Sequence, residues 1–288
     1  MDQAKKRKIA ARVIGAPLLI AALLFLVWLD HKNNQIVAIR FLIAALSGLG
    51  MIEFLLMVRG KGYPVFWSPC VPLLVLPALP WSWILGSPVP EFFFPAVLFF
   101  VASLFFHILL RRGGLSIESA GCALLGFFYL GALQIVCHTP TGIPVEMFSW
   151  FLLFLLATNK GSDMAAYVAG NLIGKRKLAP EISPSKTWEG AIAGAIVGAG
   201  TGYAVLRYGL HEPLGSLPDW SLMGFALLVT ISAQMGDLVE SAIKRWAGVK
   251  DSGHLIPEFG GILDMVDSFL VSIPVTYVGM EILFRVFS

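Results

Sequence analysis

Long apolar segments constrain the fold of this 288-residue chain more than any other feature. Apolar side chains make up 57% of the sequence and charged side chains only 14%. Nearly every long segment must therefore face lipid rather than water. We expect an all-α polytopic integral membrane protein.

Nine segments have the length and hydropathy of a membrane span, so the two termini should lie on opposite sides of the bilayer. The first segment follows a basic stretch and lacks a small-residue cleavage pattern, which favours a retained signal-anchor helix over a signal peptide. The segments lie near residues 13–29, 36–58, 65–85, 92–110, 118–136, 147–168, 189–206, 220–239 and 264–284.

The basic residues are distributed unequally between the two sides that these spans define. Of the 21 lysines and arginines, 16 fall in the N-terminal segment and the even-numbered loops, and three fall on the opposite side. Cytoplasmic segments carry the excess of basic residues in membrane proteins. The N-terminus and the even-numbered loops are therefore predicted to be cytoplasmic.

The chain divides by chemistry into N-terminal transmembrane helices (residues 1–140) and a C-terminal catalytic transmembrane region (residues 141–288). The first part has only isolated polar residues, such as Glu53 and His107, and a lone His in such a helix is more often a hydrogen-bonded packing residue than a ligand. Polar residues gather from 147 onward, and the run 158–163 interrupts the sixth apolar segment. Such an interruption is typical of backbone that lines protein or water. The alternative is a short helix that ends near 157, followed by a polar loop.

Hydroxyl and basic residues precede the seventh span, in the sequence Ser-Pro-Ser-Lys-Thr-Trp-Glu-Gly from Ser183 to Gly190. A helix that begins here would offer unpaired N–H groups and its positive dipole end to a polyphosphate. An ordinary capped helix start explains the same pattern. Within the helix, Gly190, Gly194 and Gly198 recur every fourth residue, which predicts close packing against another helix.

Acidic residues concentrate where the eighth span ends and the ninth begins. Asp237, Glu240 and Lys244 are spaced to share one face of a helix, and Asp264 and Asp267 are one turn apart. Hard oxygen ligands without a Cys/His set favour Mg²⁺ over zinc. Surface ion pairs at the lipid boundary would account for only some of these charges.

The remaining composition is less informative about partners. Cys70, Cys122 and Cys137 are scattered, so neither a disulfide framework nor a zinc site is expected. The net charge of +3 follows mostly from topology, and no nucleic-acid partner is predicted from it.

In its C-terminal half the chain resembles the phosphatidate cytidylyltransferase family, also called CDP-diacylglycerol synthases. The resemblance is specific over roughly residues 155–270. The family's last motif is matched by Ser241, Ile243, Lys244, Arg245, Lys250, Asp251, Gly253, Ile256, Pro257, Gly260, Gly261, Ile262, Asp264, Val266 and Asp267. Upstream family elements are matched by Asp163, Ala166, Tyr167, Gly170, the run 183–190, Gly236, Asp237 and Glu240.

The resemblance implies that a phosphate oxygen of phosphatidate attacks the α-phosphorus of CTP, giving CDP-diacylglycerol and pyrophosphate with the assistance of Mg²⁺. It implies a second, monovalent ion such as K⁺, a multi-pass location in the cell inner membrane and an active site that faces the cytoplasm; a homodimer is left open. The implied metal ligands are Asp237, Asp264 and Asp267. Asp251 and Lys244 are expected to join them as catalytic residues. The implied substrate-binding residues are Asp163, Ser183, Ser185, Lys186, Thr187, Arg245 and Lys250.

Two positions depart from the family's motif: Phe259 stands where a His is usual and Met265 where an Arg is usual. Phe259 cannot exchange a proton, and Met265 removes a cation. Three alternatives stay open: a CTP-dependent lipid kinase, an ion-coupled transporter with a broken helix, and an inactive scaffold of the same fold.

Overall fold

The computed structural model describes residues 21–23, 25–32, 37–65, 117–138, 145–210, 214–253 and 260–287. The predicted spans near 65–85 and 92–110 lie outside these residues, apart from position 65. Five described helices are long and apolar enough to cross a membrane, which agrees with an all-α membrane protein. They are Val37–Gly60, Glu118–Val136, Trp188–Gly209, Asp219–Ala247 and Ile262–Leu283.

The chain divides into two compact units. The first comprises residues 1–145 and 247–266, and the second comprises residues 146–246 and 267–288. Each unit therefore combines an upstream stretch with part of the C-terminal motif region.

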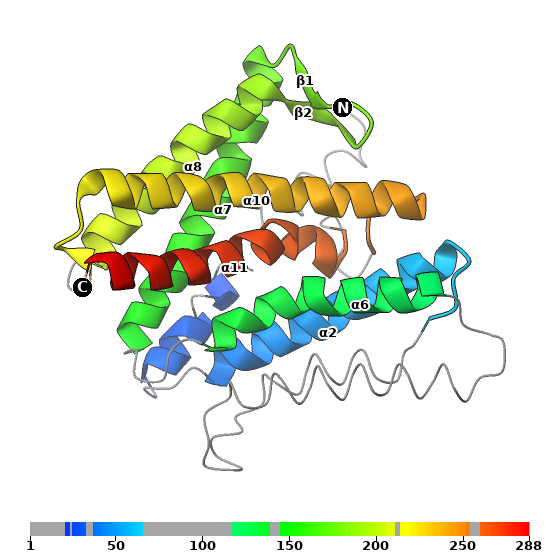
Figure 1. Ribbon diagram of the computed structural model, residues 1–288, viewed down its shortest axis with the longest axis horizontal. Helices are drawn as coiled ribbons and strands as arrows, with labels where there is room; N and C mark the ends of the chain where they lie inside the picture. The colour runs from blue at the N-terminus through cyan, green and yellow to red at the C-terminus, as the bar shows by residue number, and fades with distance from the viewer. Residues whose placement is uncertain are drawn as a thin grey trace. The chain divides into compact units, whose positions relative to one another are not determined.

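In the first unit, α2 (Val37–Gly60) packs along α6 (Ile117–Gly131), as Figure 1 shows. It also packs against the 3₁₀ helix η2 (Ala132–His138). The N-terminus of α2 is capped by the buried carboxylate of Asp30, which accepts hydrogen bonds from the N–H groups of Ala38 and Ile39 at 2.8 and 2.9 Å. Gln134 of η2 donates a hydrogen bond to Ser47 of α2 at 2.9 Å. Asp30 and Gln134 thus each pair a buried polar group within this unit.

The second unit contains α7 (Val145–Ile173), α8 (Trp188–Gly209) and most of α10 (Asp219–Ala247) and α11 (Ile262–Phe287). Its apolar core includes the stacked rings of Phe154 and Phe225, whose centroids are 5.5 Å apart. The observed ends of α8 and α11 extend the predicted spans by one to three residues, whereas α10 continues eight residues beyond position 239, to Ala247.

The predicted glycine ridge of α8 is confirmed as a packing surface. A Cβ on Gly190, Gly194 or Gly198 would lie within 2.9 Å of a backbone oxygen of α7, contributed by Ala166, Ser162 or Thr158 respectively. Helix α8 therefore approaches α7 more closely than any side chain at these positions would permit.

Helix α7 is continuous, so the predicted interruption at 158–163 is wrong, and so is the alternative of a helix that ends near 157. The polar side chains bond within the helix instead of breaking it. Thr158 donates to the carbonyl of Phe154 at 2.8 Å, and Asn159 donates to that of Leu155 at 2.7 Å. Asn159 also donates to Ser272 of α11 at 3.1 Å.

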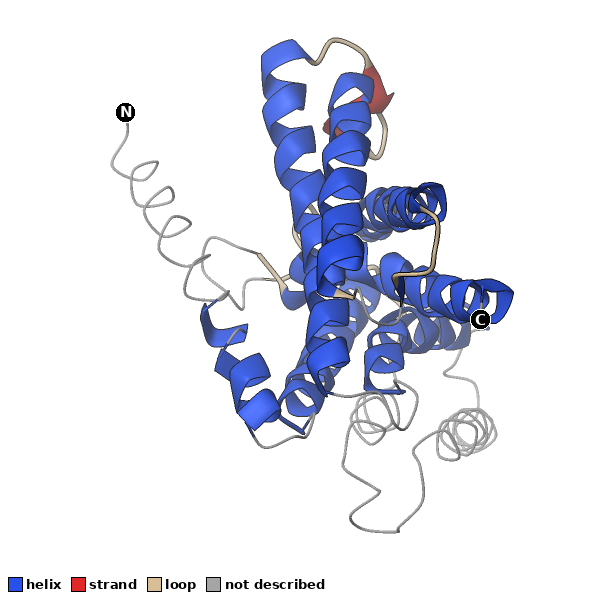
Figure 2. Ribbon diagram, turned by 90° about the vertical axis from the view of Figure 1, so that its left-hand side faces the viewer, coloured by secondary structure: helices blue, strands red, loops and turns tan. Residues whose placement is uncertain are grey.

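A short hairpin, drawn in red in Figure 2, is an element that the all-helical expectation did not include. Strand β1 (Lys177–Ala179) pairs antiparallel with β2 (Ser183–Thr187), with Lys177 opposite Thr187 and Ala179 opposite Ser183. The hairpin therefore connects the end of α7 to the start of α8.

Candidate active site

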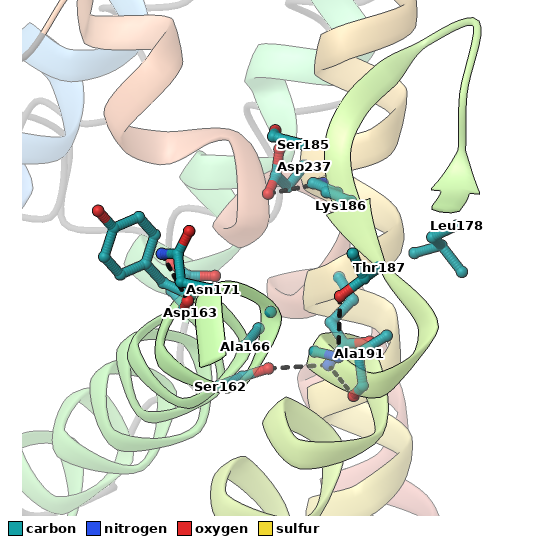
Figure 3. Close-up of a pocket in the computed structure, with 14 residues that line it drawn as sticks. Ser162, Asp163, Ala166, Asn171, Leu178, Ser185, Lys186, Thr187, Ala191 and Asp237 are labelled. Carbon is teal, nitrogen blue, oxygen red and sulfur yellow. Dashed lines mark hydrogen bonds and ion pairs between the residues drawn. The ribbon is translucent and has the colours of Figure 1, made fainter. Parts of the chain in front are cut away.

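A pocket of about 320 Å³ opens in the second unit where the end of α7, the hairpin, the start of α8 and α10 meet (Figure 3). Helix α7 contributes Ser162, Asp163 and Asn171, and α10 contributes Gln234 and Asp237. The hairpin contributes Ser185, Lys186 and Thr187. One face of the pocket is therefore lined by a cation and hydroxyl groups.

The hairpin is fixed against the start of α8 by the sequence that was predicted to begin that helix. Thr187 has extended backbone angles and caps α8, because its hydroxyl accepts a hydrogen bond from the N–H of Gly190 at 3.2 Å. Glu189 accepts hydrogen bonds from the N–H groups of Lys175 and Arg176 at 3.1 and 3.3 Å. The strand that carries Lys186 is thereby held beside the pocket.

The opposite wall of the pocket is organised by Gln234 of α10. Its side-chain nitrogen donates to the hydroxyl of Ser162 and to the carbonyl of Ala191, both at 3.0 Å. These two bonds tie α10 to α7 and to α8.

In Figure 3, Lys186 reaches from the hairpin toward Asp237, and its ammonium nitrogen lies 2.7 Å from the carboxylate.

Three carboxylates of the second unit form a cluster that could hold a metal ion. Oxygens of Asp237, Glu240 and Asp267 lie within 4.8 Å of one another. Helices α10 and α11 approach closely here because residue 236 is glycine: a Cβ on Gly236 would lie 2.7 Å from the carbonyl oxygen of Asp267. Hard oxygen donors of this kind suit Mg²⁺.

The cluster contains one carboxylate that is fully buried. Glu240 has no exposed surface, and one of its oxygens lies 2.6 Å from the ammonium nitrogen of Lys244, one turn later on α10. The predicted shared face of Asp237, Glu240 and Lys244 is therefore observed. Lys244 provides a cation beside a cluster that would otherwise concentrate negative charge.

Comparison with known proteins identifies the family of the chain. The sequence profile of the cytidylyltransferase family matches residues 10–283. The chain belongs to the cytidylyltransferase family. It is 30% identical to the phosphatidate cytidylyltransferase of Staphylococcus haemolyticus over 260 residues, which cover 89% of this chain and 94% of the relative. It is 37% identical to the phosphatidate cytidylyltransferase of Brucella suis over 187 residues, covering 59% and 67%, and 40% identical to that of Haemophilus influenzae over 151 residues, covering 51% of each.

In this cytidylyltransferase, Asp264 lies in the first unit and has a different environment from the cluster. Its Oδ2 accepts hydrogen bonds from the N–H and the hydroxyl of Ser252, at 3.0 and 2.8 Å, and from the N–H of Gly261 at 2.8 Å. Asp264 therefore ties the loop at Ser252 to the start of α11. Of the three predicted metal ligands, Asp237 and Asp267 belong to the acidic cluster found among the described residues.

The other predicted site residues occupy varied positions. Asp163 lines the pocket and pairs with Lys160 at 3.2 Å. Arg245 is exposed on α10 and donates a hydrogen bond to the carbonyl of Ile182, in the hairpin turn, at 3.1 Å. Lys250 and Asp251 are exposed after α10. Ser183 is half-buried in β2. Of the two positions that depart from the family motif, Met265 is half-buried in α11 and Phe259 lies outside the described residues.

Sequence reasoning missed two acidic residues that the structure places in defined networks. Glu240 was seen to share a face with Asp237 but was not proposed as a ligand. Glu53 was interpreted as isolated polarity, yet it accepts hydrogen bonds from Ser252 and from the start of α11. One signal in the sequence could have identified Glu53. A carboxylate within an apolar helix is energetically costly, so it is expected to have a hydrogen-bonding or charged partner.

Proposed function

We propose that this cytidylyltransferase transfers the cytidylyl group of CTP to phosphatidate. A phosphate oxygen of phosphatidate forms a bond to the α-phosphorus of CTP. The bond from that phosphorus to the oxygen bridging to the β-phosphorus breaks, so CDP-diacylglycerol and pyrophosphate are the products. The supporting observation is that Asp237 belongs both to the acidic cluster and to the pocket lined by Lys186.

We propose Asp237, Glu240 and Asp267 as the residues that would hold Mg²⁺. When bound, Mg²⁺ supplies charge neutralisation to the phosphates of CTP. This reaction needs positioning and electrostatic stabilisation more than a protein nucleophile. The second, monovalent ion implied by the family resemblance stays part of the proposal.

The basic and hydroxyl side chains would bind and orient phosphate groups. Lys186 stands at the pocket beside Asp237, and Ser185 and Thr187 flank it in the strand. Lys244 lies beside Glu240 and balances its charge. The roles predicted for Asp163, Ser183, Arg245, Lys250 and Asp251 remain proposals based on the family motif. Asp264, the third metal ligand predicted from the family motif, also remains a proposal; its Oδ2 ties the loop at Ser252 to α11.

We further propose that the N-terminus and the loops that carry these residues are cytoplasmic and that the protein resides in the inner membrane. The unequal distribution of lysine and arginine supports this orientation, because 16 of the 21 fall on the same side. Water-soluble CTP would then meet the lipid headgroup at the cytoplasmic border.

The test is incubation of the purified protein with phosphatidate, Mg²⁺ and CTP labelled on either the α- or the γ-phosphate. Transfer of the α-label to lipid, with release of pyrophosphate, is the expected result. Transfer of the γ-label would identify a lipid kinase instead. An absence of labelled lipid, with the protein folded and the Staphylococcus haemolyticus enzyme active in the same assay, would refute the proposal.

A further inference from the structure

Glu53 is a buried carboxylate in the middle of α2, with 2% of its surface exposed. Burying a carboxylate in an apolar helix is costly unless hydrogen bonds or charges compensate it. Its partners are the start of α11: Oε1 accepts from the N–H of Ile262 and Oε2 from the N–H of Leu263, both at 2.9 Å. These are among the N–H groups that a helix leaves without an internal partner at its N-terminus.

Two carboxylates therefore satisfy the first N–H groups of α11. Asp264, in the first turn, reaches back to the N–H of Gly261, as an acidic residue does in a capping box. Glu53 supplies the second carboxylate from a helix more than 200 positions earlier in the chain. The positive end of the α11 dipole also favours negative charge at this point.

The backbone around Glu53 leaves no room for other side chains. A Cβ on Gly253 would lie 2.5 Å from Oε1 of Glu53, and a Cβ on Gly261 would overlap both Oε2 of Glu53 and the hydroxyl of Ser252. The two glycines of the motif are thus required by the close approach of the chain to this carboxylate. A loop that lay over α2 without approaching Glu53 so closely would leave space for a Cβ at these positions.

Ser252 connects the two carboxylates. Its hydroxyl lies 2.8 Å from Oδ2 of Asp264 and 3.2 Å from Oε2 of Glu53, while its N–H also donates to Asp264. A hydroxyl has one proton, so the shorter contact takes most of it and Glu53 shares the remainder. The result is a network of Glu53, Ser252 and Asp264 that joins α2, the loop and α11.

We propose that Glu53 is a positioning residue for cytidylyl transfer. It fixes Ser252, which directly follows Lys250 and Asp251, and it fixes the first turn of α11, the helix that carries Asp264 and Asp267. The inference rests on the proposed function. It assigns to the N-terminal part of the chain a direct role in placing the C-terminal motif.

The decisive comparison is between Glu53→Gln and Ser47→Ala. In Glu53→Gln one acceptor oxygen becomes an NH₂ group, which meets an N–H of α11 and repels it. Ser47→Ala is the matched control, because it removes another buried hydrogen bond of α2, to Gln134, without touching the loop or α11. Both variants are expected to have a lower Tm than wild type.

The readouts that separate positioning from stability are kcat at saturating substrates and the Mg²⁺ concentration for half-maximal rate. Small misplacements of catalytic groups cost up to about 100-fold in rate. We expect Glu53→Gln to lower kcat at least roughly ten-fold on this basis and to raise the Mg²⁺ midpoint, whereas Ser47→Ala should leave both within about two-fold. A Glu53→Gln enzyme with a lower Tm but a normal kcat and Mg²⁺ midpoint would overturn the inference.

A second variant decides the matter if Glu53→Gln does not fold. Ser252→Ala keeps both bonds from Glu53 to α11 and the N–H bond to Asp264, and it removes the hydroxyl bonds to Asp264 and Glu53. It should therefore fold, with a smaller fall in kcat and a raised Mg²⁺ midpoint. Unchanged kinetics would overturn the inference. An inactive wild-type protein would overturn the proposed function as well, whereas an active wild type with unaffected variants would overturn this inference alone.

Discussion

The ammonium nitrogen of Lys186 lies 2.7 Å from a carboxylate oxygen of Asp237, so a salt bridge links the hairpin before α8 to α10. Both side chains are partly exposed, at 23% and 31%. The contact pairs a residue proposed to bind phosphate with a residue proposed to bind metal. We expect the pair to separate when Mg²⁺ and CTP bind, because each partner then meets a stronger opposite charge.

Replacing Lys186 with Met should have opposite effects on metal and nucleotide. Asp237 loses its neutralising partner, so Mg²⁺ should bind more tightly without nucleotide, as measured by titration calorimetry. A charge-assisted contact is worth about 1.5–3 kcal/mol, so KM for CTP should rise roughly ten-fold or more. Arg207→Met is the matched control, since it breaks a different ion pair with α10, that between Arg207 of α8 and Asp219 at 3.3 Å. Equal effects of the two variants would contradict this role for Lys186.

Asp237→Asn and Asp267→Asn should each lower kcat by about 100-fold or more. The reason is that each removes a charge from the cluster proposed to hold Mg²⁺. Asp219→Asn is the control, because it neutralises an exposed carboxylate at the start of the same helix α10. The measurement is the initial rate over a Mg²⁺ titration. Near-normal turnover in both cluster variants would refute the metal-site assignment.

Lys244→Met should be strongly destabilising. It leaves the fully buried Glu240 without the cation that lies 2.6 Å away, and breaking a buried pair costs about 3–5 kcal/mol. The double variant Glu240→Gln/Lys244→Met should recover much of that loss, since no uncompensated charge remains. Unfolding in detergent measures both. If Glu240 contributes to a metal site, added Mg²⁺ should raise the Tm of Lys244→Met more than that of the double variant.

Gly198→Ala and Gly200→Ala should have opposite effects on stability, although both change α8. A Cβ on Gly198 would lie 2.5 Å from Thr230 and 2.9 Å from the carbonyl oxygen of Thr158, so alanine there should cost about 1–3 kcal/mol. A Cβ on Gly200 meets nothing within 4 Å, so alanine there should gain about 0.5–1 kcal/mol through helix propensity. Equal Tm values for the two variants would contradict the ridge packing.

Cysteines placed at the two ends of α8 should react with an impermeant reagent from opposite sides of the membrane. Suitable exposed positions are Pro180 in the hairpin turn and Ser216 before α10, in a background without Cys70, Cys122 and Cys137. We expect Pro180→Cys to be labelled from the cytoplasmic side, because the basic residues gather there. Labelling of both positions from one side would refute the crossing by α8.

Hydropathy predicted the described membrane helices well, because a helix that crosses the lipid must be apolar over about 20 consecutive residues. It failed at residues 158–163 of α7, where polarity was interpreted as a break. Thr158 and Asn159 bond to carbonyls of their own helix, and Ser162 receives a bond from Gln234. Such local bonds satisfy polar groups without ending a helix, and their partners on other helices are not visible in the sequence.

Helical spacing alone predicted the site only within one helix, and the family resemblance was needed to add residues from other elements, such as Asp267. Asp237 and Glu240 are three positions apart, so their shared face follows from the sequence. Asp267 joins them because Gly236 lets α10 and α11 approach closely, which is a tertiary fact. Asp264, one turn before Asp267, stays a predicted ligand of the same metal, and its bonds to Ser252 and Gly261 through Oδ2 are a second tertiary feature that spacing does not give.

The contact between Glu53 and Ser252 also has a consequence for biosynthesis, because its partners are 199 positions apart in the chain. A ribosome adds about 5–20 residues per second, so Glu53 would be made roughly 10–40 seconds before its partners exist. During that interval the carboxylate needs a temporary environment, such as the water-filled insertion channel, the membrane surface or another protein. Conditions that slow the elongation of the last third of the chain should therefore favour degradation of the unfinished chain, in which Glu53 of α2 still lacks its partners.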